Sequence, residues 1–116
     1  MSDDWFEVAV RAVEAAATDV HAAVDDVVGM LRHAADERSE GTRLQAVVAG
    51  LVDGGGREAR LAPTVAYDRF EAAVTAYRAR AIRALVDEEG LSFTDVGRLT
   101  GVSRQMVARL YQSVEE

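Results

Sequence analysis

A heptad repeat of apolar residues over residues 6–34 constrains this chain more than any other feature, because such a repeat fits a helix and no strand. The apolar positions recur alternately every four and three residues: Phe6, Val10, Val13, Ala17, Val20, Val24, Val27, Leu31 and Ala34. Further apolar residues flank this stripe at Ala9, Ala16, Ala23 and Met30. The stripe is therefore wider than the seam of a two-stranded coiled coil, which predicts a helical bundle.

Two further helices are predicted after the long one. Residues 43–52 place four apolar side chains on one side of a short helix, which the glycines at 54–56 should end. The segment GGGREARLAP is the predicted hinge, and Pro63 marks a new start. A third helix should then run from Thr64 to about Glu89, where Gly90 can end it.

The stretch LSFTDVGRLTGVSRQMVARLYQ, residues 91–112, contains start and stop signals for two short helices. Ser92 predicts the N-cap of a helix over 93–100, with Asp95 in its first turn. Gly101 predicts the left-handed residue that ends this helix, and Ser103 the cap of a second helix from Arg104 to about residue 113.

The apolar residues of these two helices are spaced to meet in one small core. They are Phe93, Val96, Leu99, Val102, Met106, Val107 and Leu110. Gly97 is small enough to let the second helix cross the first closely. The pattern is that of a helix-turn-helix.

This stretch resembles the DNA-binding helix-turn-helix at the C-terminus of serine recombinases and in region 4 of primary-type sigma factors. The resemblance rests on LSFTDVGRLTGVSRQMV, about a fifth of the chain. Gly101 falls on the family's turn glycine, Val102 and Ser103 on its turn ending, and Val107 on its buried recognition-helix position. Gly97 stands where the family usually carries alanine.

Together these patterns predict an all-α fold. A long N-terminal helix and a short helix form a bundle, and a three-helix unit with the helix-turn-helix follows. We expect residues 1–61 to serve dimerisation or interaction, and residues 62–116 to hold the connecting helix and the motif at 92–112.

The charge balance is acidic, which is unusual for a DNA-binding protein. The net charge is -7, and the acid is concentrated in residues 1–60, with 12 acidic side chains and 6 arginines, against 8 and 7 in residues 61–116. The motif itself is net positive, because its charged residues are Asp95, Arg98, Arg104 and Arg109. We therefore expect weak, strongly salt-sensitive DNA binding by a single motif.

Composition excludes several other classes of protein. There is no cysteine, so a disulfide framework or a cysteine zinc site is excluded. No apolar run reaches membrane-spanning length, and the start MSDDW lacks the basic residues of a signal peptide, so we expect a cytoplasmic protein. Lysine and asparagine are absent and isoleucine occurs once, a bias that indicates a GC-rich bacterial source.

No pattern predicts an enzyme, a metal or a cofactor. Without lysine there is no phosphate-binding P-loop. His21 and His33 lie on the long helix near acidic residues, where solvated helix pairs explain them better than a metal site. Serine and threonine have no histidine partner in any catalytic pattern. Trp5 is expected to anchor a core or an interface.

The main hypothesis is a sequence-specific DNA-binding transcriptional regulator, whose second motif helix enters the major groove of double-stranded DNA. The expected DNA-binding residues are Arg98, Ser103, Arg104, Gln105, Ala108, Arg109 and Gln112. Arg104 and Gln105 are the base readers, because arginine can pair with guanine and glutamine with adenine. Arg98, Ser103 and Arg109 are better placed for phosphate.

Two alternatives stay open. In one, the chain is a protein-interaction module, which keeps a helix-turn-helix scaffold while its acidic N-terminal bundle binds a protein partner. The two hypotheses differ in whether the motif arginines form one positive face, unopposed by the acidic residues at 87–89. In the other, a pocket in the bundle senses a small ligand.

Assembly follows from the length of the apolar stripe. The predicted second helix of about ten residues is too short to cover it, so we expect a homodimer through the N-terminal helices. The alternative is that the third helix folds back over the stripe within one chain.

Overall fold

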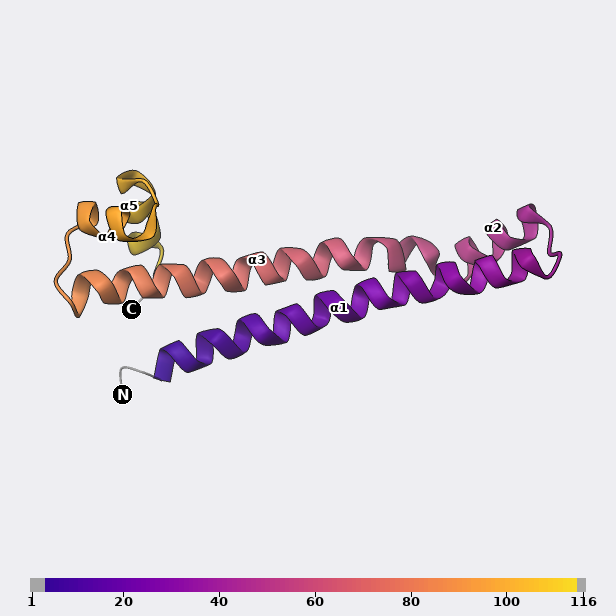
Figure 1. Cartoon of the computed structure of the whole chain (residues 1–116), viewed down its shortest axis with the longest axis horizontal. Helices are drawn as coiled ribbons and strands as arrows, with labels where there is room; N and C mark the ends of the chain where they lie inside the picture. Colours follow the sequence, from indigo (N-terminus) through magenta and orange to yellow (C-terminus); the bar gives the residue numbers. More distant parts are fainter. Residues whose placement is uncertain (1–3, 115–116) are drawn as a thin grey trace. The chain divides into compact units, whose positions relative to one another are not determined.

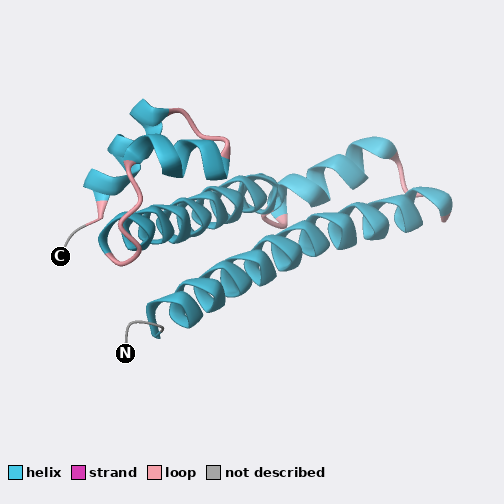
Figure 2. Ribbon diagram, turned by 60° about the vertical axis from the view of Figure 1, so that its left-hand side comes forward, coloured by secondary structure: helices cyan, strands magenta, loops and turns pink. Residues whose placement is uncertain are grey.

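The computed structural model describes residues 4–114, which form five helices and no strand (Figures 1 and 2). In chain order the helices are α1 (Asp4–Ser39), α2 (Leu44–Asp53), α3 (Gly56–Asp87), α4 (Phe93–Thr100) and α5 (Arg104–Ser113). The predicted all-α fold, with a long N-terminal helix followed by shorter ones, is confirmed.

The chain packs into two compact units. One comprises residues 14–70, and the other residues 4–13 together with 71–114. The packing thus divides the chain differently from the predicted regions 1–61 and 62–116, because α1 and α3 each contribute to both units.

The predicted start of the third helix at Thr64 was wrong, since α3 begins at Gly56 and contains Pro63. Gly55, with φ +88°, makes the turn after α2, and its carbonyl accepts the amide of Ala59 at 2.9 Å. A proline inside a helix removes one backbone hydrogen bond, but residues 57–62 are mostly strong helix formers. The proline is therefore a local cost within α3 and not its boundary.

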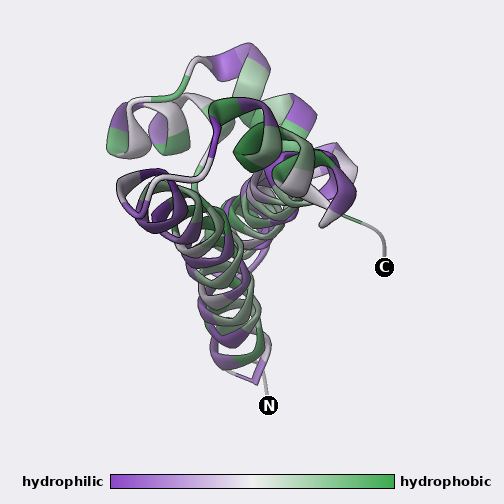
Figure 3. Cartoon of the chain, turned by 90° about the vertical axis from the view of Figure 1, so that its right-hand side faces the viewer, coloured by the Kyte–Doolittle hydropathy of each residue, from purple (hydrophilic) through white to green (hydrophobic). Residues whose placement is uncertain are grey.

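In the unit of residues 14–70, α1 turns only part of the predicted stripe inward. Ala34 is buried and the flanking Ala23 and Met30 are half-buried, whereas Val24 and Leu31 are exposed. Apolar and polar residues alternate around the turns of the long helices (Figure 3). The inward row is therefore rotated towards the flanking alanines, and one edge of the stripe stays in solvent.

In the other unit, the start of α1 is anchored by aromatic side chains on α3. The Phe6 ring packs edge-on against Tyr77, with 5.5 Å between centroids, and the Arg80 guanidinium lies 5.2 Å from the centroid of Trp5. Trp5 thus serves as an anchor between two helices, as expected from the sequence.

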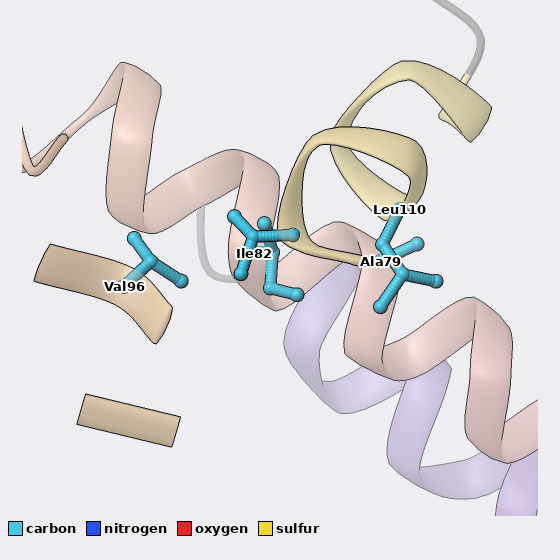
Figure 4. Close-up of a cluster of buried hydrophobic side chains, with 5 residues drawn as sticks. Ala79, Ile82, Val96 and Leu110 are labelled. Carbon is cyan, nitrogen blue, oxygen red and sulfur yellow. The ribbon is translucent and has the colours of Figure 1, made fainter. Parts of the chain in front are cut away.

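The helix-turn-helix core is built from three helices. The buried side chains are Ala79 and Ile82 from α3, Val96 from α4, and Val107 and Leu110 from α5 (Figure 4). Val96 and Val107 have no exposed surface. The end of α3 is therefore the third helix of the unit, as predicted.

Local caps set the ends of α4 and α5 as the sequence predicts. The Ser92 hydroxyl accepts the amide of Asp95 at 3.0 Å, and the Ser103 hydroxyl accepts that of Met106 at 3.1 Å. Gly101 ends α4 with φ +78°. The turn between the two helices is therefore specified by neighbouring residues.

Leu99 was wrongly predicted to join the core, because it is 66% exposed. At about 100° per residue, Leu99 lies about 60° around α4 from Val96, on the side away from Phe93. Spacing alone placed it at the edge of the apolar face, and the packing of the unit leaves that edge in solvent.

Gly97 allows the turn to lie directly against α4. A Cβ at this position would be 2.7 Å from the carbonyl oxygen of Val102, closer than two such atoms can approach. The position that carries alanine in the resembling family has no room for one here.

We expect Gly97→Ala to destabilise the protein, although alanine is the better helix former by about 0.8–1 kcal/mol. The clash with the Val102 carbonyl should dominate and lower the free energy of unfolding by about 1–3 kcal/mol, measured by urea denaturation. Gly29→Ala on α1 is the matched control, because its Cβ meets no atom within 4 Å, and it should stabilise. Equal gains from both substitutions would contradict the close approach at Gly97.

Candidate nucleic-acid interface

The surface of α5 opposite the core carries five of the seven predicted DNA-binding residues. At about 100° per residue, Arg104, Ala108, Gln112, Gln105 and Arg109 follow one another over an arc of about 140°. Four of them are exposed and Ala108 is half-buried, whereas the core residues lie on the opposite side. The helix thus presents one continuous polar face to solvent.

Two of the arginines on this face are available for an external anion. Within residues 4–114, neither Arg104 nor Arg109 takes part in an ion pair. Arg98, on α4, lies 3.5 Å from the Asp95 carboxylate, and both side chains are largely exposed. Such an exposed pair is weak, so Arg98 can exchange this partner for a phosphate.

Ser103 has a structural role that does not prevent a second contact. Its oxygen accepts the Met106 amide in the α5 cap. A hydroxyl has one proton to donate besides its lone pairs, so Ser103 can still donate to a phosphate oxygen.

Arg83 holds the far end of α5 against α3 and was not identified as a site residue from the sequence. Its guanidinium donates to the carbonyls of Tyr111 and Val114, both at 3.2 Å, and to the Asp87 carboxylate at 2.8 Å. It also lies 4.4 Å from the centroid of the Tyr111 ring. The last carbonyls of α5 thus receive a cation, which also suits the helix dipole.

Tyr111 completes this contact by donating its hydroxyl to the second Asp87 oxygen at 2.6 Å. The hydrogen bond from Tyr111, followed by that from Arg83, lowers the pKa of Asp87 below its ordinary value of 3.8. The i,i+4 spacing of Arg83 and Asp87 is visible in the sequence, but the tyrosine 24 residues further on is not. We call Arg83, Asp87 and Tyr111 the α3–α5 clamp.

The acidic residues at the end of α3 do not pair with the α5 arginines. Asp87 belongs to the clamp, and no ion pair joins Glu88 or Glu89 to Arg104 or Arg109 within the described chain. Glu88 and Glu89 instead line a groove of about 530 Å³ with Trp5 and Phe6. Within the described chain, Arg104 and Arg109 are therefore not paired with the acidic residues at 87–89.

The histidines give no sign of a metal centre in the part of the chain that the structure describes. His33 Nε2 lies 3.6 Å from a Glu37 carboxylate oxygen in an exposed i,i+4 pair, a solvated helix pair of the kind expected from the sequence. No three histidine or carboxylate side chains among residues 4–114 come close enough to hold an ion.

Comparisons with known proteins identify no relative. No family model, curated protein or solved structure matches the chain. Within residues 4–114, no helix combines the length and apolar composition that a membrane crossing requires. We therefore infer a function from the geometry of the α5 face.

We expect Tyr111→Phe to weaken the clamp in a pH-dependent way, because it removes a donor to Asp87 and keeps the ring. A carboxyl whose pKa is lowered by folding stabilises the protein above its unfolded pKa, and this stability is lost as the pH falls through the folded pKa. The melting temperature of the variant should lie below that of the wild type at pH 7, and the gap should close below pH 3.8.

Tyr77→Phe is the control, since no hydrogen bond of the Tyr77 hydroxyl is present among the described residues. The difference in melting temperature between Tyr77→Phe and the wild type should not depend on pH. A gap for Tyr111→Phe that persists unchanged below pH 3.8 would contradict the coupling to Asp87.

Proposed function

We propose that this chain is a sequence-specific regulator of transcription that binds double-stranded DNA as a homodimer, with α5 in the major groove. One observation carries the proposal. The exposed arc of α5 carries two arginines without ion-pair partners, Arg104 and Arg109, and two glutamines, Gln105 and Gln112. The opposite side of the same helix is buried in the core. The major groove admits a helix with such a face.

The positions along α5 suggest the role of each residue. Arg104 and Gln105 lie in the first turn, the part of a recognition helix that reaches base edges, and their side chains can pair with guanine and adenine. Ala108 is small and lies in the middle of the arc, where it lets the backbone approach the groove. Gln112 extends the same face one turn further.

Arg98, Ser103 and Arg109 lie around this base-reading strip and fit phosphate contacts. Their side chains are exposed on α4, at the α5 cap and on the far edge of the arc, respectively. Contacts of this type orient a protein on the duplex without reading its sequence. The α3–α5 clamp supports the proposal, because a recognition helix must keep its orientation while it binds.

The charge balance explains why two copies are needed. A net charge of -7 opposes binding to DNA, and the α4–α5 pair offers three arginines against one aspartate. A single motif makes few phosphate contacts, so its affinity at physiological salt is low. Two motifs about 34 Å apart match successive turns of the major groove and make the second contact intramolecular.

We place this activity in the bacterial cytoplasm, and it needs no cofactor, metal or catalytic step. A protein-interaction module is the second candidate, favoured by the acidic balance of residues 1–60. Selection of bound sequences from a random duplex pool at low salt separates the two. Enrichment of a two-fold symmetric site supports the regulator, and no enrichment supports the interaction module.

Arginine substitutions on α5 should separate base reading from phosphate binding. Arg104→Ala should cost about 1–3 kcal/mol on the selected site and relax one base position. Arg109→Ala should weaken all sequences alike and lower the slope of log K against log salt by about one. Fluorescence anisotropy over a salt series measures both effects.

Arg69→Ala is the matched control, because it removes the same charge from an exposed position on α3, outside the helix-turn-helix. It should leave sequence preference and affinity nearly unchanged. Equal, sequence-independent losses from Arg104→Ala and Arg109→Ala would overturn the assignment of Arg104 to a base.

A further inference from the structure

The unit of residues 14–70 has very little core of its own. Its buried hydrophobic side chains are Ala34, Val47 and Ala66, one from each of its three helices, and two of these are alanines. The hydrophobic effect scales with apolar area removed from water, so these small side chains supply little of the stability that 57 residues need. Another surface must supply part of it.

α2 is the helix with the largest mismatch between composition and burial. Its sequence LQAVVAGLVD contains one charged residue, Asp53, at its last position. Val47 is buried and Leu51 half-buried, but Leu44, Val48 and Val52 are 58%, 49% and 60% exposed. A helix that is hydrophobic all round is normally covered on all sides, so the outer face of α2, defined by these three residues, lacks a partner.

The other two helices of the unit also expose apolar side chains at helical spacing. Nine of the twelve exposed large hydrophobic residues of the described chain belong to residues 14–70. They are Val24, Val28, Leu31, Leu44, Val48, Val52, Leu61, Val65 and Tyr67. They lie on more than one side of these helices, so one partner can cover only part of their exposed area, and the outer face of α2 would be the centre of a contact that neighbouring residues extend towards the ~800 Å² per partner of a stable interface.

We propose that the outer face of α2 is the centre of a symmetric contact between two copies of this chain. A second copy is the occupant, because this face can meet its own equivalent without bringing like charges together. Two chains with a net charge of -7 repel each other over most of their surfaces, but the outer face of α2 is uncharged. The same lack of charge gives a nucleic acid or a basic peptide nothing to pair with there.

The ends of α2 indicate its direction in such a pair. Arg43 precedes α2 at the positive end of the helix dipole and Asp53 lies at the negative end, so each charge is unfavourable in its own helix. An antiparallel partner brings the opposite end of a second α2 next to each of them. A two-fold axis then passes near Val48, in the middle of the helix, and the contact is isologous.

This inference rests in part on the proposed function, since a second recognition helix is what the DNA-binding face requires. It differs from a seam along the predicted stripe of α1, because α2 supplies the central contact and Val24, Val28 and Leu31 can only extend it.

Val48→Asp tests the interface on the full-length chain. Val48 is half exposed within one copy, so the variant should keep its far-ultraviolet helical signal. In the dimer it places two carboxylates at the axis, which should weaken association at least about 30-fold. Sedimentation velocity over a concentration series should show a wild-type dimer at about 50 µM and a dissociation constant for Val48→Asp at least about 30-fold higher than that of the wild type.

Val8→Asp is the matched control, because Val8 is a valine on α1 outside residues 14–70 and is 65% exposed against 49% for Val48, and this variant should associate as the wild type does. A monomeric wild type, or a Val48→Asp variant with the dissociation constant of the wild type, overturns the proposal. If Val48→Asp loses its helical signal, Val48→Cys decides, because the chain has no other cysteine. An interchain disulfide under oxidising conditions supports the α2 contact, and its absence overturns it.

The failure of this inference is distinguishable from that of the proposed function. A monomeric wild type that still enriches a duplex sequence removes the α2 contact and keeps the DNA-binding role. A dimer that Val48→Asp dissociates, but that enriches no sequence, keeps the contact and removes the role.

Discussion

The buried cluster that joins Val96 and Val107 to the end of α3 is the contact on which the helix-turn-helix unit depends. α4 and α5 have eight and ten residues, too few for either to be stable alone in water. Both valines are fully buried, and Ile82 and Ala79 close the core from α3. Since this core fixes which side of α5 is hidden, it also fixes which side is offered to a ligand.

The charged residues of the same unit include two groups, those that hold helices together and those that face solvent without an ion-pair partner among the described residues. Arg83 and Asp87 are used between helices, where they hold the end of α5, and their opposite charges cancel locally. Arg104 and Arg109 have no such partner in the described chain. An acidic protein can therefore keep a small cationic face, provided that its carboxylates near that face are engaged elsewhere.

Residues 14–70 bury fewer hydrophobic side chains than the helix-turn-helix unit does. Among residues 4–114, five of the eight buried hydrophobic residues belong to the helix-turn-helix core, and three lie in residues 14–70. Long alanine-rich helices approach closely but remove little apolar area from water. The second copy that we propose on the outer face of α2 would add to the stability of that unit and would also supply the second recognition helix of the proposed function.

Sequence alone determined the features that depend on interactions within a few residues. The caps at Ser92 and Ser103 and the left-handed Gly101 were predictable, because a cap joins residues three apart and positive φ selects glycine. Tertiary structure alone decided the rest. Helix formers overrode Pro63, the packing of the unit left Leu99 in solvent, and Arg83 found the carbonyl of Tyr111, 28 residues away. Periodicity gives the direction of a side chain around its helix, but only the packing of several helices decides what lies in that direction.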